Sequence, residues 1–205
     1  MAASNRTALM TANEAASVTG VPLRQVHRII DAGLLDGAVK RRRNARLLPR
    51  AALVGLRLAH DTADVLTPET RRAVVASLLH RPRRNAIRAA PVVVDARPAA
   101  QAVRSGLKQL AKARQAVSRS HDVLGGTVVF KGTRIPVHDI ADMLANGDLP
   151  AAILKAYPRL DQECVRLAAI YAAAYPRRGR PPGKPAARRG YKRTVETIPF
   201  VLARS

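Results

Sequence analysis

Residues 126–137 read GTVVFKGTRIPV, and the first eight of them raise the question of a phosphate-binding loop. A P-loop needs a glycine, four residues and then Gly-Lys-Ser/Thr, so that successive backbone N–H groups converge on one phosphate. Here lysine and glycine are exchanged, as Lys131-Gly132-Thr133, and the VVF run before them consists of stiff, β-forming residues. The stretch therefore predicts a β-hairpin, in which Lys131-Gly132 is the two-residue turn and residues 133–135 form the returning strand.

Three short helices are predicted to follow this hairpin. Pro136 leads into a first helix, which Asn146-Gly147 closes, and Pro150 starts a second. Asp161 can cap a third. The apolar side chains that these helices would bury are Ile140, Met143, Leu144, Ile153, Leu154, Val165, Leu167, Ala168 and Tyr171. A hairpin followed by three helices predicts a small helical domain.

The segment from GG to YAAAYP, roughly residues 122–176, resembles the bacterial domain-of-unknown-function family 433, whose members include VapB-type antitoxins. Its most specific features are KGTRIPV at 131–137 and YPRL at 157–160. One departure is Leu149, where relatives often carry a serine or threonine cap. The resemblance implies an antitoxin of a type II toxin–antitoxin system, which neutralises a PIN-domain ribonuclease toxin and represses its own operon. It supplies no catalytic residues.

The N-terminal third predicts a helix-turn-helix. The sequence TANE at 11–14 is a capping box, in which threonine and glutamate side chains satisfy each other's backbone N–H groups, so a helix should run from about 12 to 18. Gly20 supplies a turn, Pro22 pre-sets the first turn of a second helix, and Gly33 ends it.

The predicted helix-turn-helix region contains two basic segments, one on the second helix and one in the hairpin after it. The face of the second helix opposite its apolar side chains can reach base edges and phosphates in a major groove, although a solvated helix face is the alternative. After this helix comes a basic hairpin, which could lie along the phosphate backbone or in the minor groove. The predicted DNA-binding residues are Arg24, Gln25, His27 and Arg28 on the helix and Lys40, Arg41, Arg42, Arg43 and Arg46 in the hairpin.

The order EAASVTGVPLRQVHRIIDAGLL, basic hairpin and a helix opened by Pro49 resembles the winged helix-turn-helix of MerR-like and excisionase-like regulators. The resemblance covers about residues 8–60. The long antiparallel coiled coil and effector domain usual in MerR-like proteins are not evident, because the next predicted helix, capped by Thr67, ends at about His80. The sequence therefore does not support small-molecule sensing.

The middle of the chain predicts a connector. RPRRNAIR at 81–88 is a polar linker, and PVVVDARP is a short strand bounded by prolines. A helix over about 99–118 carries apolar residues at helical spacing, namely Val103, Leu107, Leu110 and Val117. This seam suits packing on a dimer mate or packing within the same chain, and the sequence leaves both open.

The composition predicts a polyanionic partner. The chain has 36 Lys plus Arg against 14 Asp plus Glu, a formal charge of +22, although a high-GC genome would also enrich arginine. The tail from Pro176 onward is rich in proline, glycine and arginine and should be disordered when alone. Arg178 and Arg180 resemble an AT-hook core, with nonspecific phosphate attraction as the alternative.

The end of the tail combines cations with apolar side chains. An arginine from it could pair with the carboxylates that hold magnesium in a PIN ribonuclease while apolar residues anchor the segment. The alternative is a tail that packs back on its own domain. The predicted toxin-binding residues are Arg188, Arg189, Tyr191, Lys192, Arg193, Ile198, Phe200 and Leu202.

Several functional classes lack supporting residues. The single cysteine, Cys164, rules out an internal disulfide framework, and the five scattered histidines have no metal-binding spacing. Asp139 and Asp142 suit a solvated helix face better than a catalytic pair. No run approaches a membrane span, and no signal peptide is evident, so a cytoplasmic protein is predicted.

The sequence thus predicts a mainly α fold with short β-hairpins, built as a winged helix-turn-helix plus a second small helical domain. The domains are a DNA-binding domain (1–80), a connector or dimerisation helix region (81–121), an antitoxin-type domain (122–176) and a toxin-binding tail (177–205). We expect a non-enzymatic antitoxin without metal or cofactor, a homodimer bound to double-stranded operator DNA and a PIN-domain toxin, with no membrane contact. The alternative is a free-standing transcriptional regulator without a toxin partner.

Overall fold

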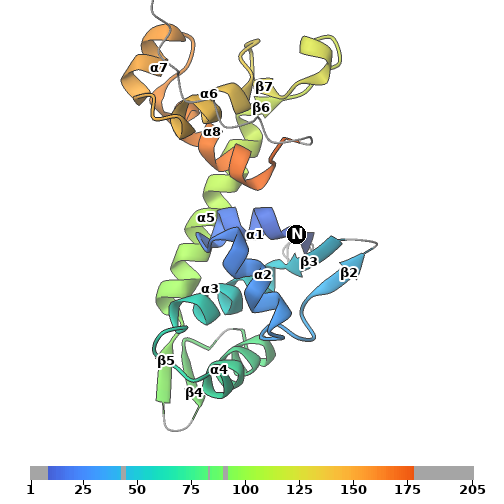
Figure 1. The fold of residues 1–205 in the computed structure, drawn as a ribbon, viewed down its shortest axis with the longest axis vertical. Helices are drawn as coiled ribbons and strands as arrows, with labels where there is room; N and C mark the ends of the chain where they lie inside the picture. The colour runs from blue at the N-terminus through green and yellow to red at the C-terminus, as the bar shows by residue number, and fades with distance from the viewer. Residues whose placement is uncertain (1–8, 43–44, 83, 90–91, 178–205) are drawn as a thin grey trace, which may run out of the picture.

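A computed structural model describes residues 9–42, 45–82, 84–89 and 92–177. The predictions for Arg43, Arg178, Arg180 and the toxin-binding set at 188–202 lie outside these residues. The described part is mainly helical, with three small antiparallel sheets, which agrees with the predicted fold class at that level. Figure 1 shows an elongated molecule in which one long helix joins the N-terminal elements to the C-terminal ones.

The first two helices form as predicted. Helix α1 (Ala12–Thr19) begins at a capping box: the Glu14 N–H donates to Thr11 Oγ1, and the Thr11 N–H donates back to Glu14 Oε2 at 2.8 Å. Gly20 ends the helix in the left-handed conformation, with φ of 70°. Helix α2 (Leu23–Asp31) follows after Pro22, so the two helices are joined by a tight turn.

The predicted basic hairpin is also present. Strands β2 (Lys40–Arg42) and β3 (Ala45–Pro49) pair antiparallel, with Arg41 opposite Arg46. A short strand that the sequence did not predict, β1 (Leu9–Met10), pairs with the other edge of β3. The helix expected after Pro49 starts as a 3-10 turn, η1 (Arg50–Ala52), and continues as α3 (Leu53–Asp61).

One part of the middle segment was predicted wrongly. Helix α4 (Pro68–His80) is capped by Thr67 as expected. The segment 81–88, predicted to be a linker, instead contributes to strand β4 (Ala86–Ala89), which pairs with β5 (Val92–Asp95). Ile87 explains the difference, because its side chain is buried against the α3–α4 pair, and such a single buried residue is invisible in a polar run.

Helix α5 (Arg97–Gln115) is the long helix at the centre of Figure 1. Its predicted seam packs within the chain: Val103 and Leu110 are buried in the N-terminal core, and Leu107 packs against it. Gly106 lies on the same helix, and a Cβ there would come within 1.9 Å of the Val18 carbonyl oxygen of α1. The two helices therefore approach at a distance that only glycine permits.

Val117 was predicted to extend the helix, but it lies in strand β6 (Val117–Ser118). This strand pairs antiparallel with β7 (Val129–Phe130), after the 3-10 turn η2 (Leu124–Gly126). Val117 instead pairs with Phe130, which lies thirteen residues later in the chain. Phe130 is a β-forming residue, and strand β7 needs a partner strand, so the chain leaves the helix before Val117.

The hairpin around Lys131-Gly132 exists with a different register. Gly132 has φ of 74°, and the Thr133 N–H donates to the Phe130 carbonyl, so a β-turn spans these residues. The Phe130 N–H, however, donates to the Ile135 carbonyl, and Val129 bridges to Pro136. The return strand is thus centred on residues 135–137 instead of the predicted 133–135.

Three helices complete the C-terminal part, as predicted. They are α6 (Val137–Ala145), α7 (Pro150–Ala156) and α8 (Gln162–Ala174). The Asp161 side chain caps α8 by accepting from the Cys164 N–H at 2.6 Å. Leu149 precedes α7 without a side-chain cap.

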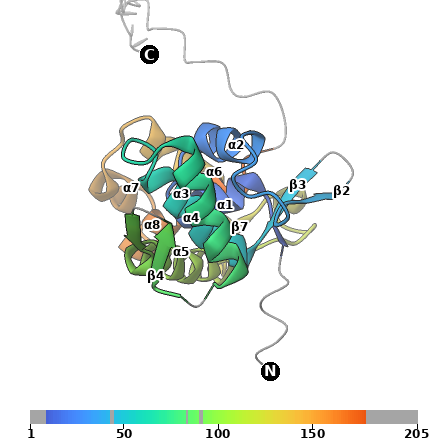
Figure 2. The ribbon, with the colours of Figure 1, turned by 90° about the horizontal axis from the view of Figure 1, so that it is seen from below.

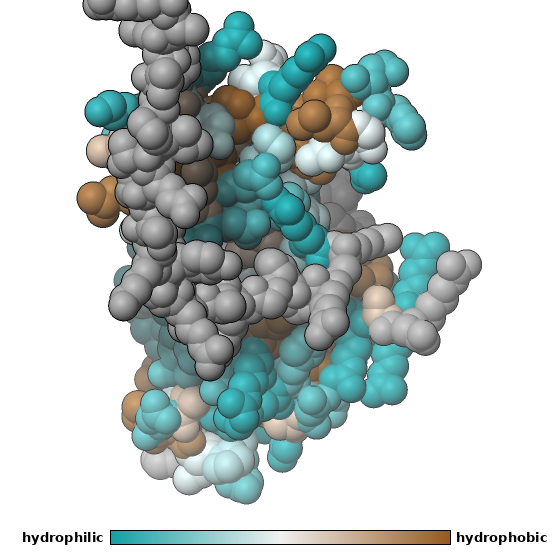
Figure 3. Space-filling view, turned by 45° about the horizontal axis from the view of Figure 1, so that its top comes forward, coloured by the Kyte–Doolittle hydropathy of each residue, from teal (hydrophilic) through white to brown (hydrophobic). Residues whose placement is uncertain are grey.

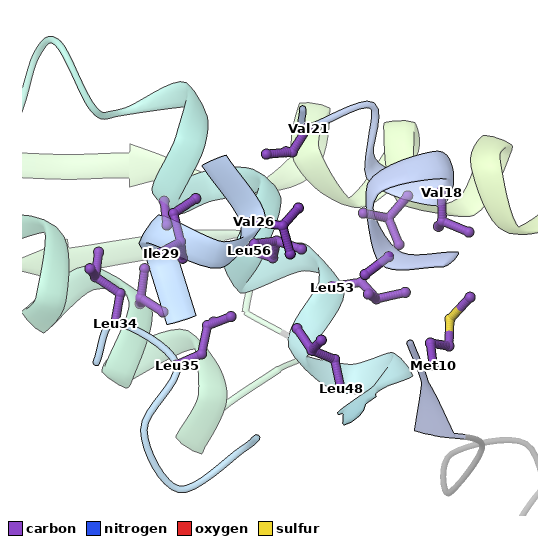
Figure 4. Packing of buried hydrophobic residues seen from close by; sticks show 14 of the residues in the cluster. Met10, Val18, Val21, Val26, Ile29, Leu34, Leu35, Leu48, Leu53 and Leu56 are labelled. Atoms are coloured by element: carbon purple, nitrogen blue, oxygen red, sulfur yellow. The ribbon is translucent and has the colours of Figure 1, made fainter. Parts of the chain in front are cut away.

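Three hydrophobic clusters hold the fold together. The N-terminal cluster joins α1, α2, α3 and the first sheet, and Figure 4 shows Val26, Leu53 and Leu56 within it. The C-terminal cluster gathers Phe130, Ile140 and the helices around them, and a third lies between α3, α4 and the β4–β5 sheet. Helix α8 belongs to the C-terminal cluster, but its last residue, Ala174, is buried in the N-terminal one.

Candidate nucleic-acid interface

Helix α2 separates its apolar and polar side chains sharply. Val26 and Ile29 are buried against the N-terminal core, which fixes the rotation of the helix. Arg24, His27 and Arg28 are therefore exposed on the other side, and Gln25 is partly exposed beside them. The predicted residues of this helix thus share one accessible face.

The β2–β3 hairpin carries the second set of cations. It projects from the body of the molecule in both ribbon views (Figures 1 and 2), and Lys40, Arg41 and Arg42 are exposed on it. Arg46 differs from them, because it forms an ion pair with Asp31 at the end of α2. This pair connects the hairpin to the helix at the surface.

The cations of this surface have no acidic partner in the described part of the chain. No ion pair or side-chain hydrogen bond within it engages Arg24, Arg28, Lys40, Arg41 or Arg42. Like charges that lie close together without counter-charges raise the local positive potential and attract polyanions. We call these five residues the basic surface. In the space-filling view, hydrophilic side chains cover much of the visible face (Figure 3).

Arg57 supports the turn between α1 and α2, a role that sequence reasoning missed. Its Nη1 donates to the Thr19 carbonyl at 2.8 Å, and its Nε donates to Asp61 at 2.8 Å. The i, i+4 spacing of Arg57 and Asp61 was the available signal. The contact to α1 was not readable, because it joins residues 38 positions apart.

A partly buried polar cluster connects α1 to the C-terminal part. Glu14 Oε1 accepts from Arg114 Nη2 at 2.5 Å and from the Tyr175 hydroxyl at 2.6 Å. Arg114 Nε also donates to the Tyr175 oxygen at 2.5 Å. We call these three residues the Glu14–Arg114–Tyr175 cluster. Glu14 also closes the capping box of α1. The first turn of α1 is therefore hydrogen-bonded to Arg114 on α5 and to Tyr175, the residue after α8.

This cluster shifts the ionisation of its members. Burial would raise the pKa of the Glu14 carboxyl, but hydrogen bonds from Tyr175 and Thr11 and the charge of Arg114 together lower it. Burial, followed by the hydrogen bond to Glu14, raises the pKa of Tyr175 to about 12. The cluster therefore holds a charged carboxylate, a charged guanidinium and a neutral phenol at ordinary pH.

A cavity of about 870 Å³ lies in the C-terminal part. His138, Tyr171 and Tyr175 form an aromatic row on its wall, with 5.9 Å and 4.9 Å between successive ring centroids. Its two arginines are engaged: Arg119 Nε donates to the Gly126 carbonyl at 2.7 Å, and Arg177 pairs with Asp139 and Asp142. This cavity therefore lacks the uncompensated charge of the basic surface.

Comparison with known proteins gives two matches. The family described as "Protein of unknown function (DUF433)" matches residues 117–172. An uncharacterized protein, y4eO, of Sinorhizobium fredii (strain NBRC 101917 / NGR234) is 36% identical over 187 residues, which cover 84% of this chain and 84% of that protein. The chain belongs to the DUF433 family. No solved structure matches it significantly.

The DUF433 segment corresponds to a structural unit from β6 to α8. It begins five residues before the stretch that resembles the family in the sequence, and it thereby includes β6, the partner strand of β7. The y4eO match is much longer than this segment, so that relative also shares sequence outside the DUF433 unit. The basic surface lies wholly outside the DUF433 segment.

Three further observations concern metal binding, membrane spanning and thiol reactivity. In the part of the chain that the structure describes, no three His, Cys, Asp or Glu side chains are grouped to hold a metal ion. No described helix is both long and apolar enough to cross a bilayer. Burial raises the pKa of the Cys164 thiol, which disfavours the reactive thiolate.

Proposed function

We propose that this DUF433 protein is a DNA-binding antitoxin of a type II toxin–antitoxin system. In this proposal, a homodimer binds double-stranded operator DNA to repress its own operon and neutralises a PIN-domain ribonuclease. The alternative, a free-standing winged-helix regulator, differs only in lacking the toxin. The observation that carries the DNA part is the basic surface, whose five cations have no acidic partner in the described chain.

The arrangement of α1, α2 and the β2–β3 hairpin supports a winged helix-turn-helix mode of binding. A major groove admits one α-helix, and the exposed face of α2 offers Arg24, Gln25, His27 and Arg28 to base edges and phosphates. The hairpin would then lie against the backbone or the minor groove, where its cations contact phosphates. The Arg46–Asp31 pair would keep both elements at a fixed spacing.

The toxin part of the proposal rests on the DUF433 membership and on the tail sequence. The resemblance implies a PIN-domain ribonuclease, whose active site holds magnesium through carboxylates. The tail after Arg177 carries 8 Lys or Arg and one Glu, followed by an apolar terminus. A basic segment of this kind would pair with such carboxylates, while Ile198, Phe200 and Leu202 anchor it.

The DNA part is tested by replacing Arg24 and Arg28 with alanine. We expect promoter-specific binding to be lost in a gel shift, because each arginine would contribute about 1–3 kcal/mol of base or phosphate contact. The matched control is Arg104→Ala with Lys108→Ala, which removes two exposed cations from α5. An unchanged shift for the Arg24/Arg28 variant would place DNA recognition elsewhere.

The toxin part is tested with the product of any adjacent reading frame that encodes an acidic PIN-type ribonuclease. Full-length protein should bind this nuclease and suppress its cleavage of RNA. Protein ending at Arg177 keeps the ion pairs of that residue with Asp139 and Asp142 and should lose suppression while still binding DNA. Equal suppression by both would refute the role of the tail, and the absence of any nuclease partner would favour the free-standing regulator.

A further inference from the structure

A small cavity lies beside the basic surface, between α2, α3 and the start of α4. Its volume is about 200 Å³. The floor is apolar and is made of Ile29, Ala32, Leu34, Ala59 and Ala63. Figure 4 shows Ile29 and Leu34 at the same end of the N-terminal core.

The remaining lining side chains are polar, and three of them are basic. They are Gln25, Arg28, His60 and Arg71, and no carboxylate lines the cavity. Within the described chain, the side chains of Arg28 and Arg71 make no ion pair or hydrogen bond, and Arg71 Nε is buried without an acceptor. A buried donor without a partner costs about 1–3 kcal/mol, so this guanidinium is poised for an acceptor that the protein does not provide.

The charged groups around the cavity are bonded to other residues and do not supply an acceptor for Arg71. Arg72, next in α4, donates to the Ala32 carbonyl at 3.2 Å. Asp61 is already paired with Arg57, and Asp31 with Arg46. The cavity thus combines an apolar floor with two arginines whose charge is uncompensated, and this combination selects for an amphipathic anion.

We propose that this cavity binds a small organic acid, with its carboxylate between Arg28 and Arg71 and its compact apolar body against Ile29 and Leu34. Arginine binds carboxylates through two parallel hydrogen bonds, which suits a pair of guanidinium groups at the rim. The volume is below the roughly 300–1,000 Å³ of pockets for drug-sized ligands, so the acid must be compact. A phosphate, whether free or in DNA, would leave the apolar floor unused.

Binding of such an acid would affect the DNA contacts proposed above. Gln25 and Arg28 belong both to the cavity and to the exposed face of α2. A carboxylate that holds Arg28 would withdraw it from phosphate and add a negative charge beside the DNA. This second step rests on the proposed function, whereas acid binding itself does not.

Calorimetric titration of the full-length protein with benzoate tests the site. Benzyl alcohol serves as the neutral analogue, and inorganic phosphate as an anion without an apolar body. We expect saturable binding of benzoate only. Arg71→Met, which keeps an apolar stem, should weaken it about tenfold or more, and Arg104→Met should leave it unchanged.

Several results would overturn the assignment. These are no saturable benzoate binding, equal binding of benzyl alcohol, or phosphate binding as tight as that of benzoate, which would make the cavity a phosphate site. If Arg71→Met changes the thermal unfolding of the free protein, His60→Gln provides a second test at the rim and should also weaken benzoate binding. An unchanged benzoate affinity in this variant would count against the site.

A DNA-binding measurement separates the two proposals. Saturating benzoate should weaken operator binding by wild-type protein in fluorescence anisotropy and leave Arg71→Met unaffected. If the protein binds benzoate but no DNA, the proposed function fails while the acid site stands. If it binds DNA but no benzoate, the acid site fails alone.

Discussion

The N-terminal and C-terminal parts of this molecule differ in their balance of charge. Residues 1–116 contain 21 Lys or Arg and 7 Asp or Glu, whereas residues 117–177 contain 7 and 6. In the C-terminal part several cations are neutralised: Arg166 pairs with Glu163 at 2.7 Å, and Arg177 with Asp139 and Asp142. On the basic surface, by contrast, five cations have no described counter-charge.

The positive net charge of the chain is therefore not spread evenly over these two parts, because residues 1–116 carry a large excess of cations and residues 117–177 are nearly neutral. A cation that is paired within the fold attracts a polyanion much less than one that is not. Within residues 1–177, attraction to nucleic acid should therefore belong to the N-terminal part, and the nearly neutral DUF433 segment should contact a partner through other forces.

The largest effect is expected from removing the hairpin cations. Lys40→Ala, Arg41→Ala and Arg42→Ala together should weaken DNA binding by about 10²-fold at low salt and reduce the slope of log affinity against log salt by about three, one for each phosphate contact. Fluorescence anisotropy over a salt series measures both.

The matched control takes the same residue types from the other part of the molecule. Lys131→Ala, Arg134→Ala and Arg159→Ala also remove one lysine and two arginines, all exposed. DNA affinity should change by less than about threefold, because these cations lie outside the basic surface. A loss of DNA affinity equal to that of the hairpin variant would show that DNA binding is not confined to the N-terminal part.

Gly106→Ala should cost the folded state about 2–3 kcal/mol, as expected of overpacking at a close helix contact. The new Cβ would lie 1.9 Å from the Val18 carbonyl oxygen, so α1 and α5 must separate. Urea denaturation measures the loss, and Ser105→Ala, at an exposed site one residue earlier, is the control. Equal stability of the two variants would mean that this contact does not hold α1 in place.

The Glu14–Arg114–Tyr175 cluster should couple the two parts by about 1 kcal/mol. Glu14→Gln, Tyr175→Phe and the double variant form a double-mutant cycle in urea denaturation. We expect the double variant to be less destabilised than the sum of the single ones, because Glu14 Oε1 accepts directly from the Tyr175 hydroxyl. Strict additivity would show that the hydrogen bond between Glu14 and Tyr175 does not couple the two parts.

Tyr175 should also make the stability of the folded state depend on pH. Its pKa is raised from 10.0 to about 12, so the folded state holds the proton more tightly than the unfolded state. This stabilisation is complete below pH 10 and is lost as the pH rises toward 12. The free energy of unfolding of wild-type protein should fall in this range more steeply than that of Tyr175→Phe, with Tyr157→Phe as the control. Parallel profiles would contradict the burial of this phenol.

Features that depend on neighbouring residues could be predicted from the sequence. The capping box of Thr11 and Glu14 and the cap of Asp161 follow from side-chain bonds across three residues, and both form as predicted. The amphipathic pattern of α2 likewise placed Arg24, His27 and Arg28 on an exposed face. Such local signals cover most of the helices and the candidate DNA-binding residues.

Features that depend on distant partners could not be predicted. Strands β1 and β6 are two residues long and exist only because β3 and β7 offer them an edge. Glu14 and Tyr175 are 161 residues apart, so neither reveals the other in the sequence. The pairing of Arg46 with Asp31 is a further case, since both read equally well as free surface charges.

The position of α8 in two hydrophobic clusters has a consequence for how such chains can be recombined in evolution. The DUF433 match ends at residue 172, yet Ala174 and Tyr175 complete contacts with the N-terminal part. The family boundary in the sequence therefore falls inside a helix and part-way through its contact with the N-terminal part, which already includes Ile170. A gene fusion that joined this segment to another N-terminal unit would have to supply a new surface for the last turn of α8, which ties the inheritance of the two parts together.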